Sequence, residues 1–311
     1  MMPITSAISS ISAAASPSQT SATNGTPLIT LLPKLVKNEE KEFVVQEQGV
    51  SLCKLSKITI RPLTKEEEFT YLKRTVAALN WFQKHGFKQY VILPQHKSFD
   101  NWYRQAEKFN AVDSYEEGMS PHFAEEENYE KSFSELYNPN SYVEGLKEIT
   151  SNKKESEKID GALKKLSLLQ KNWGFQLLPK YQIRLTLYGV TANDDVNSGT
   201  IFLRITPFVN NFSGSIIHEV VHIGVEKNIV QKFKLTCAER ECLVDLICSI
   251  YFKEIFPKYT LQYLCSKWPI AKSMAEFVNE KTIIADLPQA ISQYAKLNPR
   301  VCVCSDKPLI M

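Results

Sequence analysis

Two histidines four residues apart, with a glutamate directly after the first, are the residues of this chain best suited to chemistry. They are His218, Glu219 and His222, in an apolar stretch of the sequence. Residues four apart on an α-helix lie on one face, so the two imidazoles can aim at a single point. Glu219 is rotated by about 100° from His218, where a carboxylate can take a proton from a metal-bound water. The spacing predicts a metal site with a base beside it.

Apolar side chains surround this motif, which predicts a buried helix over 214–228. They are Ile216, Ile217, Val220, Val221, Ile223 and Val225. Burying two histidines and a glutamate in such a helix is costly unless those groups have partners. The alternative is that both histidines are ordinary core or surface residues.

A catalytic zinc site needs a third protein ligand and leaves one position for water. No histidine follows His222, but Glu241 comes after a gap of eighteen residues, and Asp245 lies four residues beyond it on the same helix face. Two acids on an otherwise apolar stretch face inward at a cost unless a cation lies there. Glu226 is a rival ligand, but the helical rise puts it about 12 Å along the axis from His218.

The pattern His-Glu-x-x-His, eighteen residues, then Glu-x-x-x-Asp resembles the gluzincin metallopeptidases, which include thermolysin and the zinc aminopeptidases. The resemblance implies that His218, His222 and Glu241 bind Zn²⁺. It also implies that Glu219 is the general base. Asp245 would then orient a ligand imidazole, a role that suits a buried carboxylate.

The resemblance covers the 65 residues from Ile183 to Ile247, and two departures limit it. The thermolysin type uses a downstream histidine to stabilise the tetrahedral intermediate, and this chain has none. The aminopeptidase type has a Gly-rich strand motif ending in a glutamate, which the run from Gly199 to Phe202 lacks. We therefore expect a zinc-dependent endopeptidase of unidentified subfamily. Strand 200–206 would be the family's edge strand, which pairs with extended substrate.

The oxyanion of such a reaction needs a hydrogen-bond donor. With no downstream histidine, a tyrosine from the helical C-terminal part is the expected donor, as in the aminopeptidase branch. Tyr259 and Tyr263, four residues apart on the next predicted helix, are the candidates placed best. Tyr251 lies ten residues past Glu241 along one helix, which is too far.

The periodicity of the chain predicts an α+β fold in which strands precede helices. A capping box at Thr64 begins a helix that runs to Gly86, and residues 153–173 form an amphipathic helix. Alternating apolar residues predict strands at 183–188 and 200–206, and helical patterns dominate beyond them. The expected core is zincin-like: a short mixed sheet, the motif helix and a helical C-terminal part.

Composition predicts three regions: a disordered leader at 1–35, a mixed α/β region at 36–180 and a catalytic region at 181–311. Sixteen of the first 26 residues are Ser, Thr or Ala, and residues 1–33 have no charge. The leader lacks the basic and apolar parts of a Sec signal peptide. Its composition resembles the leaders of bacterial type III secretion substrates. The leader is therefore either the secretion signal of an effector delivered to a host cell or a flexible tail with no targeting function.

The whole-chain composition excludes several classes of protein. The net charge is only +3 and no stretch is strongly basic, so the charge pattern does not indicate nucleic-acid binding. No apolar run approaches the roughly 20 residues that a membrane-spanning helix needs. Seven cysteines, an odd number, favour a reducing compartment such as the cytoplasm. A protein or peptide is the expected partner, as substrate.

Two other functions compete with the endopeptidase. One is a non-enzymatic binding or scaffold protein on a zincin-like fold, and the other is a metal hydrolase of non-peptide substrates. A structural zinc site is closed by four protein ligands, and Cys237 and Cys242 lie wrongly for that. A structural site also has no use for the base at Glu219, which favours catalysis.

Overall fold

The computed structural model describes residues 58–84, 88–108, 126–205, 212–259, 261 and 273–299, and two short strands near the N-terminus. The chain divides into two compact units, Met1–Gln48 and Gly49–Met311. In the first unit, β1 (Val36–Lys37) pairs with β2 (Phe43–Val44) in antiparallel orientation. The leader predicted at residues 1–35 lies outside the described residues. Everything below concerns the second unit.

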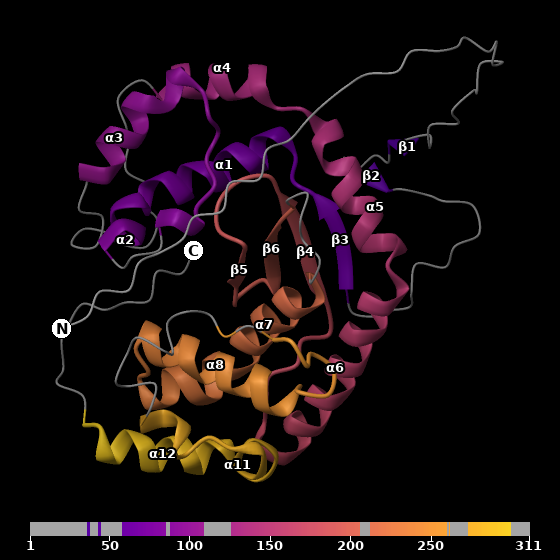
Figure 1. The fold of residues 1–311 in the computed structure, drawn as a ribbon, viewed down its shortest axis with the longest axis vertical. Helices are drawn as coiled ribbons and strands as arrows, with labels where there is room; N and C mark the ends of the chain where they lie inside the picture. The colour runs from indigo at the N-terminus through magenta and orange to yellow at the C-terminus, as the bar shows by residue number, and fades with distance from the viewer. Residues whose placement is uncertain are drawn as a thin grey trace, which may run out of the picture. The chain divides into compact units, whose positions relative to one another are not determined.

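A four-stranded sheet with the order β3-β4-β6-β5 lies at the centre of this unit (Figure 1). Its strands are β3 (Ile58–Pro62), β4 (Tyr181–Thr186), β5 (Ala192–Asp195) and β6 (Thr200–Arg204). The first two and β6 are parallel, whereas β5 runs antiparallel to β6 at the edge. One sheet therefore joins the predicted regions 36–180 and 181–311.

The predicted edge strand is wrong in one respect. The segment expected at 200–206 forms β6, which lies between β4 and β5, and the edge strand is β5. The turn-rich sequence of β5, Ala-Asn-Asp-Asp, lacks the apolar alternation that indicates a strand. It is held instead by antiparallel pairing with β6, from Ala192 opposite Leu203 to Asp195 opposite Thr200.

Helices make up most of the remaining structure, which is α+β as predicted. The structure has α1 (Lys65–Ala77), α2 (Leu79–Lys84), α3 (Asp100–Lys108), α4 (Glu126–Leu136), α5 (Val143–Ser151), α6 (Lys153–Trp173), α7 (Phe212–Val225), α8 (Cys237–Tyr251), α11 (Glu280–Ala285) and α12 (Leu287–Leu297). Short 3₁₀ helices occur at Lys88–Tyr90, Lys97–Phe99 and Pro139–Tyr142. A π-helical stretch, Glu226–Gln231, continues α7. None of the helices in the described part of the chain has the length and apolar character that a bilayer crossing requires.

Capping residues set the starts of the helices that matter for the site. Thr64 and Glu67 form the predicted capping box of α1, and Thr236 and Glu239 form the same arrangement at the start of α8. The predicted helix at 153–173 is confirmed as α6, which ends at a left-handed Gly174.

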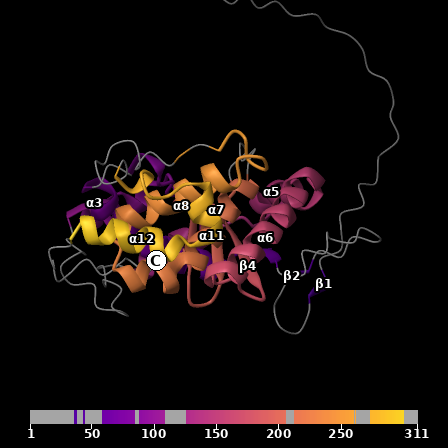
Figure 2. The ribbon, with the colours of Figure 1, turned by 90° about the horizontal axis from the view of Figure 1, so that it is seen from below.

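Two hydrophobic cores hold these elements. The larger one joins the sheet to α6, α7 and α8, and buries alternate residues of the strands such as Ile183 and Leu203. The smaller one is aromatic and joins α1 to α3 and α4, with the ring of Trp102 stacked on that of Tyr129. Seen from below in Figure 2, α11 and α12 lie along the helical layer of α7 and α8. The larger core therefore fixes the helix that holds the histidine motif.

Candidate metal centre

Two packed helices bring the predicted metal ligands together. His218 and His222 lie one turn apart on α7, and Glu241 lies in the second turn of α8. The close packing of α7 depends on Gly224, because a Cβ atom there would overlap the buried ring of Phe175. Both histidines are buried, whereas the side chain of Glu241 is 24% exposed. The group is therefore reached from solvent on its carboxylate side.

The three side chains converge on one point. The Nε2 atoms of His218 and His222 lie 2.9 Å apart. An Oε2 atom of Glu241 lies 3.2 Å from Nε2 of His222 and 3.6 Å from Nε2 of His218. Among the described residues, this is the group of His, Cys, Asp and Glu side chains that could hold a metal ion.

Such a convergence needs a positive charge at its centre. Two imidazole lone pairs and a carboxylate facing one another in a buried place repel unless a proton or a metal ion lies between them. Burial lowers the pKa of His218, but contacts with Cys248 and Glu241 outweigh it and hold that pKa well above its usual range. Burial raises the pKa of Glu241, and the charge of His222 reverses this to well below its usual range. The site therefore favours a cation.

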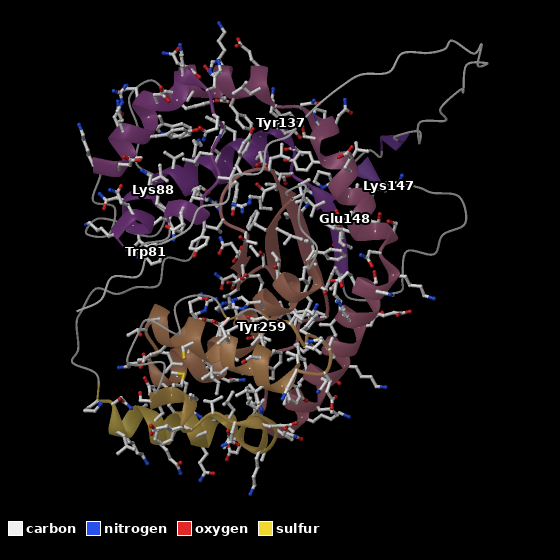
Figure 3. The ribbon with its side chains drawn as sticks, viewed as in Figure 1. Trp81, Lys88, Tyr137, Lys147, Glu148 and Tyr259 are labelled. Atoms are coloured by element: carbon white, nitrogen blue, oxygen red, sulfur yellow. The ribbon has the colours of Figure 1, made fainter. Side chains whose placement is uncertain are left out.

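A tyrosine fixes the ring of His218 from behind. The hydroxyl of Tyr259 lies 2.7 Å from Nδ1 of His218 and donates a hydrogen bond to Oδ1 of Asp245 at 2.8 Å. Since its one hydrogen is given to Asp245, the Tyr259 oxygen accepts the hydrogen on Nδ1 of His218. This leaves the lone pair on Nε2, which faces the other ligands. Figure 3 labels Tyr259 in the layer of α7 and α8.

This arrangement places two of the residues predicted for the site. Asp245, the predicted orienting residue, lies 3.8 Å from Nδ1 of His218 and accepts a hydrogen bond from Tyr259, whose hydroxyl contacts the same Nδ1. The hydroxyl of Tyr259 is bound at Nδ1, on the side of the ring away from Nε2, which does not suit the predicted oxyanion donor. Tyr263, the other predicted donor, lies outside the described residues.

The predicted base lies beside the ligand group with its carboxylate uncommitted. Glu219 is buried and makes no hydrogen bond or ion pair with any other described residue. Burial, opposed by the charge of His218, raises the pKa of Glu219 to about 8. A divalent cation next to it would lower this pKa and leave an ionised carboxylate able to accept a proton.

Comparisons of the chain with protein-family models, with curated proteins and with solved structures give no match.

Sequence reasoning missed Arg240, which anchors the ligand helix. Its Nη2 atom lies 2.9 and 3.0 Å from the two carboxylate oxygens of Asp194, and its Nε lies 3.3 Å from Glu226. This buried pairing ties α8, which holds Glu241, to the edge strand β5. The sequence does show a basic residue, Arg240, next to Glu241. Its acidic partners, Asp194 and Glu226, are distant from it in the sequence, so the ion pairs could not be predicted.

The rejected alternatives have other roles in the structure. Glu226 belongs to the Arg240 ion pair and not to the ligand group, which agrees with its exclusion as a metal ligand. The hydroxyl of Tyr251 donates to the backbone oxygen of Lys165 on α6 at 3.0 Å. Tyr251 therefore faces away from the ligand group, as its distance along the helix predicted.

Proposed function

We propose that this protein is a zinc-dependent endopeptidase of the gluzincin type. The observation that supports the proposal most is the convergence of His218, His222 and Glu241, with the uncommitted carboxylate of Glu219 next to them. A structural metal site has no need for such a base, whereas hydrolysis of a peptide bond requires one.

The residues present fit zinc. Two imidazole nitrogens and one carboxylate are a common ligand set for catalytic zinc, and three protein ligands leave a position for water. A bound Zn²⁺ would supply Lewis acidity, which lowers the pKa of a coordinated water to about 7 and polarises a substrate carbonyl.

Side chains of the protein would carry out proton transfer and hold the metal ligands in position. Glu219 takes the proton that the attacking water loses and gives it to the nitrogen of the leaving amine. Tyr259 and Asp245 hold the hydrogen of His218 on Nδ1, so that its Nε2 lone pair is always presented. Arg240 keeps Glu241 in place by fixing α8 on β5.

The edge strand supports a peptide as the substrate. In the described part of the chain, β5 pairs on one side only, with β6. Its other side leaves backbone groups to which an extended peptide can add as a further strand. Asp194 on β5 is bound to Arg240 of the ligand helix, so this edge lies next to the ligand group.

The test compares the zinc-loaded wild type with Glu219→Gln on a mixture of unstructured peptides analysed by mass spectrometry. The wild type should cleave internal bonds, lose activity with a chelator and regain it with Zn²⁺. Glu219→Gln should keep its zinc while turnover falls by at least 10²- to 10⁴-fold, the range typical of acid–base catalysis.

The matched control is Glu148→Gln, an exposed glutamate on α5 that is labelled in Figure 3. It should keep both zinc and activity. The proposal is overturned if the zinc-loaded wild type cleaves no peptide, or if Glu219→Gln cleaves as fast as the wild type.

A further inference from the structure

Arg204, the last residue of β6, is buried, and no residue that the structure describes gives it an acidic partner. It is 9% exposed, and its Nη1 donates to the backbone oxygens of Tyr90 at 2.8 Å and Gly189 at 2.5 Å. Its Nε is buried with no hydrogen-bond partner, and no carboxylate among the described residues forms an ion pair with it. Burial lowers the pKa of Arg204.

A second arginine, largely but not fully buried, shows what is missing. Arg240 is paired with the carboxylates of Asp194 and Glu226, as a buried guanidinium normally is. Within the described part of the chain, Arg204 has only neutral carbonyls for partners, and these engage one of its three nitrogens. A group that only clamped two carbonyls would not need a positive charge or the remaining donors of a guanidinium.

A tyrosine hydroxyl lies beside this arginine. Tyr71 of α1 stacks on Phe202, two residues before Arg204 on β6, with ring centroids 4.8 Å apart. Its ring lies against Gly189, where φ is 90° and a Cβ atom would be 2.8 Å from the Tyr71 oxygen. The same Gly189 accepts the hydrogen bond from Arg204, so the phenol and the guanidinium meet there.

The Tyr71 hydroxyl is also uncommitted, and it links Arg204 to the candidate metal centre. It makes no hydrogen bond with any other described residue. Burial and the charges of Glu68 and Glu219 raise the pKa of Tyr71, whereas the charge of Arg204 lowers it. The strand that holds Arg204 and the Phe202 ring stacked on Tyr71, β6, packs against α7, the helix that holds His218 and Glu219.

We propose that Arg204 and Tyr71 form a subsite that binds a carboxylate of the peptide substrate. This inference rests on the proposed peptidase function and names its substrate class: a peptide with an acidic side chain, or a free C-terminal carboxylate, near the cleaved bond. The Nε and Nη2 donors of Arg204 form the fork that a carboxylate accepts, and the Tyr71 hydroxyl adds a third donor.

The first experiment measures kcat/KM of the zinc-loaded wild type on matched peptides. One arm places Glu or Gln at each position near the cleaved bond, and the other compares a free C-terminus with its amide. At one position, or at the C-terminus, the carboxylate should be preferred by roughly 10- to 100-fold, as expected for charge-assisted hydrogen bonds. The arm that shows the preference identifies the source of the carboxylate.

Two substitutions assign that preference to the residues. Arg204→Met removes the charge, and Tyr71→Phe removes one hydroxyl but keeps the ring stacked on Phe202. In Arg204→Met, the ratio of kcat/KM for the carboxylate peptide to that for its neutral partner should fall to nearly 1. In Tyr71→Phe, the same ratio should fall several-fold. The second variant still tests the subsite if Arg204→Met does not fold. Arg74→Met, an exposed arginine on the same helix as Tyr71, is the control and should keep the full preference.

A binding measurement separates failure of this inference from failure of the proposed function. Fluorescence anisotropy with the zinc-loaded Glu219→Gln variant should show tighter binding of the carboxylate peptide than of its amide partner, dependent on Arg204. Cleavage without any carboxylate preference overturns the subsite and leaves the peptidase standing. If no peptide is cleaved, the binding preference alone decides, and equal binding of both peptides overturns the subsite.

Discussion

Tyr259 joins His218 to Asp245, because its hydroxyl accepts the Nδ1 hydrogen of the ring at 2.7 Å and donates its own hydrogen to the carboxylate. The relay fixes which nitrogen of His218 is free to bind a metal. It also makes the segment that follows α8, and not the motif helix itself, responsible for the orientation of His218.

Removal of the Tyr259 hydroxyl should weaken metal binding without removing it. Tyr259→Phe keeps the ring but leaves Asp245 and His218 without their bridge. Zinc affinity, measured by competition with a chromogenic chelator, should fall about 10- to 100-fold, as for other residues that orient ligands.

The control for this substitution is Tyr294→Phe. Tyr294 is another buried tyrosine that donates to a carboxylate, that of Glu239, outside the ligand group. Its substitution should leave zinc affinity unchanged. If both variants bind zinc like the wild type, the proposed relay has no effect on the ligand.

Loss of Arg240 should destabilise the whole unit. Arg240→Met leaves the buried carboxylates of Asp194 and Glu226 without their cation, and the free energy of unfolding should fall by about 3–5 kcal/mol. Urea denaturation followed by circular dichroism measures this change.

Neutralising the two acids should restore much of that stability. The triple variant Arg240→Met, Asp194→Asn, Glu226→Gln has no uncompensated charge and should unfold closer to the wild type. Equal instability of the single and triple variants would show that packing of the arginine, and not charge pairing, is what stabilises this contact.

The buried carboxyl of Glu68 should make stability depend on pH. Burial raises the pKa of Glu68, although Thr186 and the amide of Leu187 donate to it. The unfolded chain therefore loses this proton at a lower pH than the folded chain. The contribution of Glu68 is complete below about pH 4.5 and is lost as the pH rises through the folded pKa.

A comparison with Glu68→Gln isolates this effect, since glutamine does not titrate. The difference in unfolding free energy, wild type minus variant, should decline above about pH 4.5 with a slope of at most ~1.4 kcal/mol per pH unit. Urea titrations at several pH values across this range measure the difference in unfolding free energy. If that difference grew with pH, the pKa of Glu68 would not be raised in the folded protein.

The parts of the site set by local spacing could be predicted from the sequence. The convergence of His218 and His222 follows from helical geometry, and a capping box accounts for Glu239, so that Glu241 remained as the ligand candidate on that helix. The α+β class followed from the change of periodicity from two residues to helical spacing.

The parts set by tertiary pairing could not be predicted in this way. The strand β5 has no apolar alternation, and its position at the sheet edge follows only from pairing with β6. The contact of Tyr259 with His218 spans 41 residues, and that of Arg240 with Asp194 spans 46. No local pattern encodes such contacts, so the link from Asp245 to His218 through Tyr259 could not be predicted.

The metal content of the purified protein tests the central claim most directly. After loading with Zn²⁺ and dialysis, the wild type and the control His96→Ala, an exposed histidine outside the site, should each hold one equivalent of zinc by mass spectrometry. His222→Ala should hold almost none, because two ligands remain. Equal zinc in the wild type and His222→Ala, or no zinc in the wild type, would contradict the assignment of a metal centre to these residues.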